Sequence, residues 1–135
     1  MIRIVFGIFI VLHGLVHLLY FGQSRRLFEL QSGMVWPDGS WAFSKLLGTG
    51  KTRLLASILC ALVAIGFVVA GIGVFAGQSW WRPLVLVSAS LSTAVYILFW
   101  DGKLRKLDNQ GGVGILINIA LVVAAYILRW PDLGF

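Results

Sequence analysis

The sequence predicts an all-α integral membrane protein, a bundle of four transmembrane helices in a single domain of residues 1–135. Of these residues 59% are hydrophobic and only 12% are charged, whereas a soluble domain carries about a quarter charged residues. A domain of this size cannot hide so much apolar surface in its own core. The apolar residues also form four runs without interior charge, each near the roughly 20 residues that span a hydrocarbon core. These runs are residues 4–22, 54–76, 84–100 and 113–128.

The first run begins just after Arg3, as the apolar region of a secretory signal peptide would. Residues 20–24, YFGQS, offer no small-x-small cleavage site. His13 and His17 also interrupt the apolar stretch that such a signal needs. We therefore expect this segment to be a retained helix.

Three connections of different character join the predicted helices. The first, residues 23–53, is long, and within it SRRLFELQ predicts an amphipathic helical turn. WPDGSW in the same connection predicts a tight turn between Trp36 and Trp41. The second, GQSWWRP, places two tryptophans at a membrane interface and Pro83 at a helix start. The third, DGKLRKLDNQGG, is short and polar.

The basic residues are distributed unevenly between the two ends of the predicted bundle. Eight of the eleven Lys and Arg residues lie in the first and third connections, and three lie at the opposite end. Because positive charge collects on the cytoplasmic side, we expect these two connections in the cytoplasm and both termini outside. Basic residues at helix ends also contact anionic lipid, so membrane lipid is the expected partner and nucleic acid is not.

A layer of polar residues is predicted in one half of the membrane, counting depth at about 1.5 Å per helical residue. Its members are His17, Cys60, Tyr96 and Asn118, one from each helix, with His13 at the inner border. Ser92 shares a helical face with Tyr96. Polar groups in hydrocarbon are costly without partners, so we expect these side chains to face inward and meet.

Two interpretations of this polar layer stay open. In the first, the side chains form interhelical hydrogen bonds that only lock the bundle. In the second, they line a small pocket that opens toward the first and third connections, with Trp36 and Trp41 in a lid. Intramembrane ionisable residues are functional candidates by default, which favours the second interpretation as a hypothesis.

A metal site is one candidate for the histidines. His13 and His17 are the only histidines, and a spacing of four residues places them on one helical face. They can chelate one metal ion, and Cys60 would complete a set suited to zinc or copper. Against this, no carboxylate accompanies them, and Gly14 stands where the metalloprotease motif H-E-x-x-H has Glu.

Other chemistries are weaker candidates. Two histidines on one face cannot ligate both sides of one haem, so only a single-His haem site stays open. A quinone or another lipophile needs an aromatic slot and one or two hydrogen-bonding groups, for which His17, Tyr96 and Asn118 are adequate. Asp101, after the third run, is a candidate to orient a histidine. Coupled transport has no dedicated residue, because no Asp, Glu, Lys or Arg lies inside a predicted span.

Two glycine motifs do not predict an active site. The first is an incomplete phosphate-binding motif, and the second predicts helix packing. GTGKT at residues 48–52 resembles the end of a phosphate-binding loop, but Lys45 stands where that motif has its first Gly. Gly73 and Gly77 have the small-residue spacing that allows close helix approach, within the bundle or in a homo-oligomer.

The stretches HGLVHLLYF, WWRPLVLVSASLSTAVYILFWDGK and GGVGILINIALVV resemble a family of small bacterial four-helix membrane proteins, loosely labelled transporter permeases. The likeness spans nearly the whole chain, and LRKLDNQ departs from it as an insertion. The resemblance implies a bacterial inner membrane and carries the family pattern onto His13, His17, Trp100, Asp101 and Asn118. There is also a fainter similarity to DoxX-like proteins, which are linked to quinone or sulfur redox partners.

From these observations we expect a protein that binds a small lipophilic ligand or cofactor near the first and third connections. His13, His17, Tyr96 and Asn118 are the expected contacts. An accessory or scaffold subunit is the first alternative, and a minimal oligomeric transporter is the second. No catalytic set is predicted.

Overall fold

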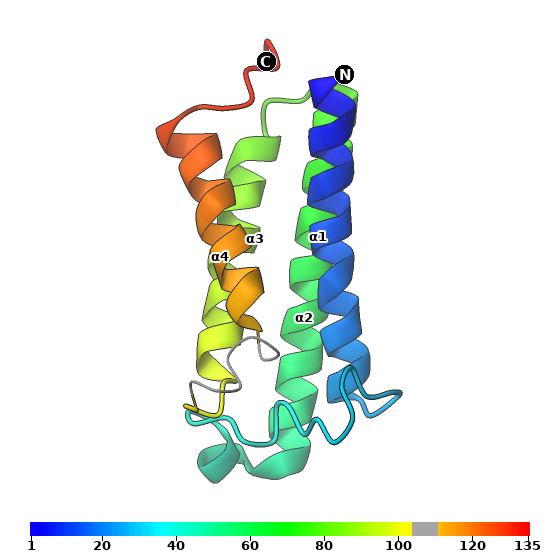
Figure 1. The fold of residues 1–135 in the computed structure, drawn as a ribbon, viewed down its shortest axis with the longest axis vertical. Coiled ribbons are helices and arrows are strands. Elements are labelled where there is room, and N and C mark those ends of the chain that lie inside the picture. Colours follow the sequence, from blue (N-terminus) through cyan, green and yellow to red (C-terminus); the bar gives the residue numbers. More distant parts are fainter. Residues whose placement is uncertain (104–110) are drawn as a thin grey trace.

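The computed structural model describes residues 1–103 and 111–135, and within them the chain is all-helical, as predicted. The elements are α1 (Ile2–Ser24), α2 (Ser44–Ala76), α3 (Trp81–Leu98) and α4 (Val113–Val122), which continues as the π-helix η3 (Val123–Ile127) (Figure 1). The first three are long and apolar enough to cross a membrane. The fourth, Val113–Ile127, is apolar but shorter.

The helices run antiparallel in chain order, and each packs on the next: α1 on α2, α2 on α3, and α3 on α4. Both termini lie at one end of the bundle, and the connection from α1 to α2 crosses the other end (Figure 1). A groove of about 370 Å³ lies between α1 and α4, lined only by apolar residues that include Phe9, Leu121 and Trp130. The bundle is therefore open along one side.

The predicted boundaries of α1 and α3 differ from the observed ones by only two or three residues, but α2 begins ten residues earlier than predicted. Charged and glycine residues made 44–53 look like part of the connection. In the structure a left-handed backbone at Gly48 (φ 75°, ψ 169°) separates a short first turn from the rest of the helix. The first connection is thus shorter than predicted, and SRRLFELQ continues the end of α1 into turns and bends without a helix of its own.

α1 places apolar side chains outside and polar side chains inside. His17 is 0% exposed and His13 is 6% exposed. The exposed large apolar side chains of this helix are Ile2, Ile4, Val5, Ile8, Phe9, Leu12, Leu15, Val16, Leu18 and Leu19. Within the described ranges no Asp, Glu, Lys or Arg is buried. Soluble monomers rarely expose apolar patches above a few hundred Å², so this surface is compatible with a membrane protein.

Two apolar clusters fill the interior. One, toward the termini, packs Phe6, Phe67 and Trp81 with smaller residues of α2 to η3. The other, toward the first connection, holds Trp36, Cys60 and Phe99 with their neighbours.

Close approach of α1 and α2 depends on small residues at the crossing. A methyl group on Gly14 would lie 2.7 Å from the Cβ of Phe67 and 3.2 Å from the carbonyl oxygen of Ala64. This contact holds α1 in the position from which its histidines reach the neighbouring helices.

Gly73 and Gly77 are engaged within the chain, and a homo-oligomer through this face stays a prediction. Gly73 is buried, and a Cβ there would lie 2.7 Å from the Trp80 ring. Gly77 follows the last helical residue with φ 71°, where it caps α2. The spacing is therefore used within the chain, for a turn and for packing on Trp80.

Gly14→Ala and Gly50→Ala form a matched pair that tests this packing. We expect Gly14→Ala to lower the free energy of unfolding by about 1–3 kcal/mol, because the methyl overpacks a backbone contact. Gly50 has nothing within 4 Å of an added Cβ, so Gly50→Ala is expected to be neutral or slightly stabilising. Thermal unfolding in detergent, followed by circular dichroism, measures both. Equal stability of the two variants would contradict the close α1–α2 contact.

Candidate functional site

The candidate site is a buried cluster of polar side chains from α1, α3 and α4. His13 Nε2 lies 2.8 Å from Asn118 Oδ1, and Asn118 Nδ2 lies 2.8 Å from Ser92 Oγ. His17 Nε2 lies 2.7 Å from the same Ser92 oxygen, and His17 Nδ1 lies 3.0 Å from the carbonyl oxygen of His13. These four bonds form a closed ring of hydrogen bonds. We call the four side chains the polar cluster and their bonds the ring.

The partners fix the direction of every hydrogen bond in the cluster for neutral imidazoles. A carbonyl oxygen only accepts, so His17 Nδ1–H donates to His13 O and His17 Nε2 accepts from Ser92 O–H. The Ser92 oxygen then accepts from the Asn118 amide, and Asn118 Oδ1 accepts from His13 Nε2–H. Each donor of the ring meets an acceptor, which is what burial in an apolar surrounding requires.

Aromatic rings enclose the two imidazoles. Phe67 of α2 lies with its centroid 4.8 Å from that of His13 and 5.7 Å from that of His17. Tyr96 stacks on His17 with centroids 5.5 Å apart and an interplanar angle of 27°. Tyr20 in turn meets Tyr96 edge-on at 5.1 Å. His17 thus contacts Tyr96 directly and is linked to Asn118 through Ser92.

Cys60 does not join the histidines in a three-residue metal set. Within residues 1–103 and 111–135 no group of three or more His, Cys, Asp or Glu side chains is placed to hold a metal ion. Cys60 is buried in the apolar cluster of Trp36 and Phe99, and the Nε2 atoms of both histidines are engaged in the ring. The sequence analysis placed Cys60 in this layer from its depth along the helix alone. In the structure its side chain packs among the apolar residues around Trp36 and Phe99.

Asp101 and the two tryptophans of the first connection lie away from the imidazoles. Asp101 follows α3, next to Gly39, and its Oδ1 accepts the Lys103 N–H at 2.9 Å. Asn118 and Ser92, instead of Asp101, orient the histidines. Trp41 is exposed and donates from Nε1 to the Ile97 carbonyl at 2.6 Å.

Trp36 is buried and forms part of the interior, where it packs edge-on against Tyr20 at 5.1 Å. Its indole Nε1 has no hydrogen-bond partner among the described residues. It therefore serves as a core side chain that anchors the first connection.

The cluster reaches the bundle surface in a groove of about 500 Å³ between α3 and α4. Asn118 and Thr93 line this groove together with Ala94, Ile97 and Val122. Asn118 Nδ2 donates to Thr93 Oγ1 at 3.2 Å, and Thr93 Oγ1 donates to the Ala89 carbonyl at 2.8 Å. A hydroxyl oxygen has two lone pairs, so Thr93 keeps one acceptor position for a ligand.

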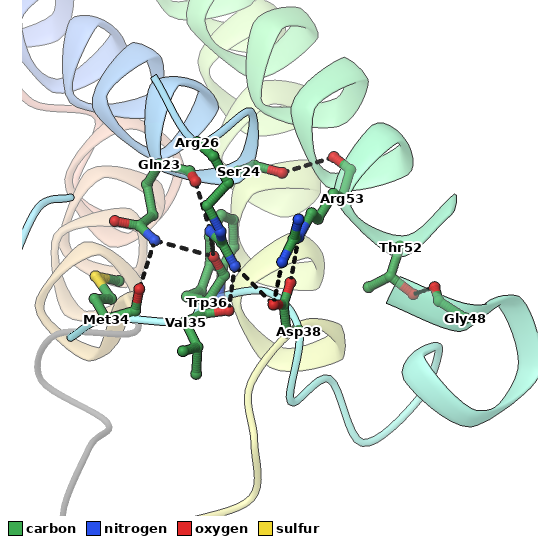
Figure 2. A network of polar contacts seen from close by, with 10 residues as sticks. All are labelled: Gln23, Ser24, Arg26, Met34, Val35, Trp36, Asp38, Gly48, Thr52 and Arg53. Atoms are coloured by element: carbon green, nitrogen blue, oxygen red, sulfur yellow. Dashed lines mark hydrogen bonds and ion pairs between the residues drawn. The ribbon is translucent and has the colours of Figure 1, made fainter. Parts of the chain in front are cut away.

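A second polar network fastens the first connection to the ends of α1 and α2 (Figure 2). Arg53 donates from Nε to Asp38 Oδ1 at 2.7 Å and from Nη2 to Asp38 Oδ2 at 2.6 Å. Arg26 Nη2 lies 2.8 Å from the same Oδ2, and Arg26 Nη1 donates to the Trp36 carbonyl at 2.8 Å. We call Asp38, Arg26 and Arg53 the loop clasp.

Gln23 and Ser24 extend the loop clasp to the last turn of α1. Gln23 donates from Nε2 to the Met34 carbonyl at 3.0 Å, and its Oε1 accepts the Leu30 N–H at 2.9 Å. Ser24 donates to the Arg53 carbonyl at 2.6 Å. Both side chains are fully buried. Gln23 thus binds the connection itself, and Ser24 binds α2.

Thr93, Phe67, Gln23 and Asp38 take part in these two networks and were missed by the sequence analysis. Thr93 stands directly after Ser92, one residue off the predicted polar face. Phe67 looked like one of many apolar residues of α2. Only Asp38 had a usable signal in the sequence. It is the single acid of the WPDGSW turn, and the same connection contains Arg25 and Arg26.

Comparison of the chain with protein-family models, with curated proteins and with solved structures finds no match. The resemblance to small bacterial four-helix membrane proteins therefore stays a prediction. Its proposed insertion, LRKLDNQ at residues 104–110, lies outside the described residues.

Ser92→Ala and Ser90→Ala test whether the cluster stabilises the bundle. Ser92→Ala removes the shared oxygen and leaves His17 Nε2 and one Asn118 N–H without a partner. We expect a loss of about 1–2 kcal/mol in the free energy of unfolding. Ser90 is exposed on the same helix, so Ser90→Ala is expected to change little. Unfolding in detergent measures both, and a Ser92→Ala variant as stable as Ser90→Ala would rule out a stabilising ring.

The loop clasp predicts a pH dependence through Asp38. Partial burial alone raises the pKa of Asp38, but the hydrogen bonds from Arg53 and Arg26 outweigh it and hold the pKa below its ordinary 3.8. A lowered folded-state pKa stabilises the fold above the unfolded value, and this contribution disappears as pH falls through the folded value. We therefore expect the native protein to melt higher than Asp38→Asn at pH 7, and the two to converge below about pH 4. A melting difference that stays constant from pH 7 to 3 would contradict the clasp.

Proposed function

We propose that this chain is a four-span inner-membrane protein that binds a lipophilic ligand in the groove between α3 and α4. The observation that carries the proposal is the opening of the buried polar cluster into this groove, through Asn118 and Thr93. A largely apolar groove with a few fixed polar groups is the usual form of a small-molecule site.

The membrane setting of the proposal rests on the surface of the bundle. Apolar side chains cover α1 outside while its histidines are buried inside, and three helices have spanning length. α4 with η3 is shorter, and we propose that it crosses with the local thinning and end-residue adjustment that short spans use. Basic residues concentrate in the first and third connections, which we propose face the cytoplasm, with both termini outside.

The cluster itself holds the groove wall in a fixed shape in this proposal. Asn118 is bound to His13, Ser92 and Thr93, so its amide cannot rotate without breaking several bonds. A preorganised wall lowers the conformational cost of binding. The histidines would then act through Asn118 instead of touching the ligand.

An accessory or scaffold subunit is a second candidate, and the closure of the hydrogen-bond ring favours it. The donors of the cluster all have partners within the chain, so no ligand is needed to complete the ring. In that function the four side chains only lock α1, α3 and α4 together. The groove would be filled by ordinary bilayer lipid without preference.

A groove-filling variant separates these two functions. Ala94 is exposed in the groove, so Ala94→Phe places a ring in the binding space. Ile65 is exposed on α2 and lines neither this groove nor the pockets beside it, so Ile65→Phe is the matched control. Lipids and other hydrophobic small molecules would be extracted from each purified protein and quantified by mass spectrometry, with absorption spectra and metal content recorded.

We expect the native chain and Ile65→Phe to retain a lipophile in about equimolar amount, and Ala94→Phe to lose most of it. Each protein must keep its helical circular dichroism for the comparison to hold. Retention no higher than the detergent background in the native chain would sink the ligand-binding function and leave the scaffold. A haem spectrum or bound metal would instead assign a cofactor.

A further inference from the structure

A second pocket of about 500 Å³ lies between the start of α3 and the end of η3 with the residues that follow it. On α3, Pro83 lines this pocket, while Ser90 and Ala94 line the groove. Pro83 and Ser90 are seven residues apart and Ser90 and Ala94 are four residues apart, so all three lie on one face of α3. On the opposite wall, Val122 lines the groove and Tyr126, four residues later, lines the pocket. The two hollows therefore follow one line between the helices.

The length of this line matches one leaflet of a bilayer. Asn118 lies at the inner part of the groove and Arg129 lies in the outer pocket, eleven residues further along the chain. The helical part of this wall runs from Asn118 to Ile127, the last residue of η3, and at about 1.5 Å per residue it is roughly 13 Å long, with Arg129 beyond its end. The hydrocarbon core is about 30 Å thick, so this is about half of it.

The outer pocket differs chemically from the groove, because two arginines line it. Arg82 donates from Nη1 to the Ala125 carbonyl at 3.0 Å and from Nη2 to the Pro131 carbonyl at 3.1 Å. A guanidinium has five N–H donors, so three stay available. Arg129 is exposed and makes no hydrogen bond or ion pair within the described part of the chain.

One acid, Asp132, also lines the pocket, and it does not neutralise the arginines directly. Its Oδ1 accepts the Gly134 N–H at 3.1 Å. Among the described residues the ion pairs are those of Asp38, at the other end of the bundle. Two guanidinium groups and one carboxylate leave the pocket with net positive charge, and Ser79 and Tyr126 add hydroxyl groups.

We propose that this line binds an anionic phospholipid, with the phosphate between Arg82 and Arg129 and one acyl chain in the groove up to Thr93 and Asn118. The proposal rests on the proposed function and names its ligand class. Guanidinium groups bind phosphate oxygens with paired, charge-assisted hydrogen bonds. The apolar groove then takes the chain that a free phosphate ion lacks. Charge at the outer end and apolar walls behind it select an amphiphile with its head at the membrane surface.

The test measures headgroup preference by native mass spectrometry in an uncharged detergent. Dioleoyl phosphatidylglycerol, dioleoyl phosphatidylcholine, oleate and inorganic phosphate are titrated separately into the native chain, and bound molecules are counted. Arg129→Gln removes the unpaired guanidinium and leaves the bonds of Arg82 intact, and Arg82→Gln/Arg129→Gln removes both. Arg25→Gln/Lys45→Gln is the matched control, because it removes two exposed positive charges at the opposite end.

We expect phosphatidylglycerol to bind the native chain and the control about tenfold more tightly than phosphatidylcholine. Arg129→Gln should lose most of this preference, and the double variant should lose all of it. Equal binding of the two phospholipids, or a preference that survives in Arg129→Gln, overturns the arginine site. If oleate binds as tightly as phosphatidylglycerol, the site takes a carboxylate amphiphile and the phospholipid proposal is wrong. If inorganic phosphate binds as tightly as phosphatidylglycerol, the acyl chain contributes nothing and the proposed place of the chain in the groove is wrong.

The outcome also separates this inference from the proposed function. If Ala94→Phe weakens both phospholipids equally and the arginine variants change nothing, the groove binds lipophiles without reading the headgroup, and only this inference fails. If the native chain binds no phospholipid above the detergent background but still yields an extracted lipophile that Ala94→Phe loses, only this inference fails; if the extraction also yields none, both fail.

Discussion

The hydrogen-bond ring of His13, Asn118, Ser92 and His17 is the interaction on which the arrangement of the bundle depends. Inside a membrane, helices gain little from the hydrophobic effect, because lipid tails are as apolar as their side chains. Buried polar groups without partners are costly there. α1 and α4 are separated by an apolar groove, yet the His13–Asn118 bond joins them. The ring thus fixes α4 at a position that packing on α3 alone would not define.

Close packing of α1 on α2 and the loop clasp supply the rest of the frame. Gly14 lets the Phe67 Cβ and the backbone of α2 approach, and the Phe67 ring then fills the space beside both imidazoles. At the end with the first connection, Asp38 joins Arg26 and Arg53 from two different helical ends. These contacts leave α3 and α4 to form the groove, whose inner wall carries the polar atoms and whose outer end carries the arginines.

Much of the helical layout could be predicted, because apolar runs report directly on length and solvent. α1 and α3 lie within three residues of their predicted bounds. α2 was misplaced at its start, since residues 44–53 carry charge and glycine that look like a connection but still form helical hydrogen bonds around Gly48. For the candidate site, depth counting identified His17, Tyr96 and Asn118 as neighbours. It also placed Cys60 near Tyr96, with which the thiol interacts, but depth says nothing of the direction in which a side chain points, and Cys60 packs with Trp36 and Phe99 instead of the histidines.

By itself the sequence determined that the chain is helical, that its long helices are compatible with a membrane, and at which height along each helix its polar residues lie. These follow from composition and from the fixed rise of a helix. Only the tertiary structure decided which polar atoms meet. His13 pairs with Asn118, which is 105 positions away in the chain, and Asn118 pairs with Thr93, which the pattern had not marked. Hydrogen bonds act over about 3 Å, so their partners depend on the rotation and separation of each helix. Contacts between helices set both quantities, and no local spacing encodes them.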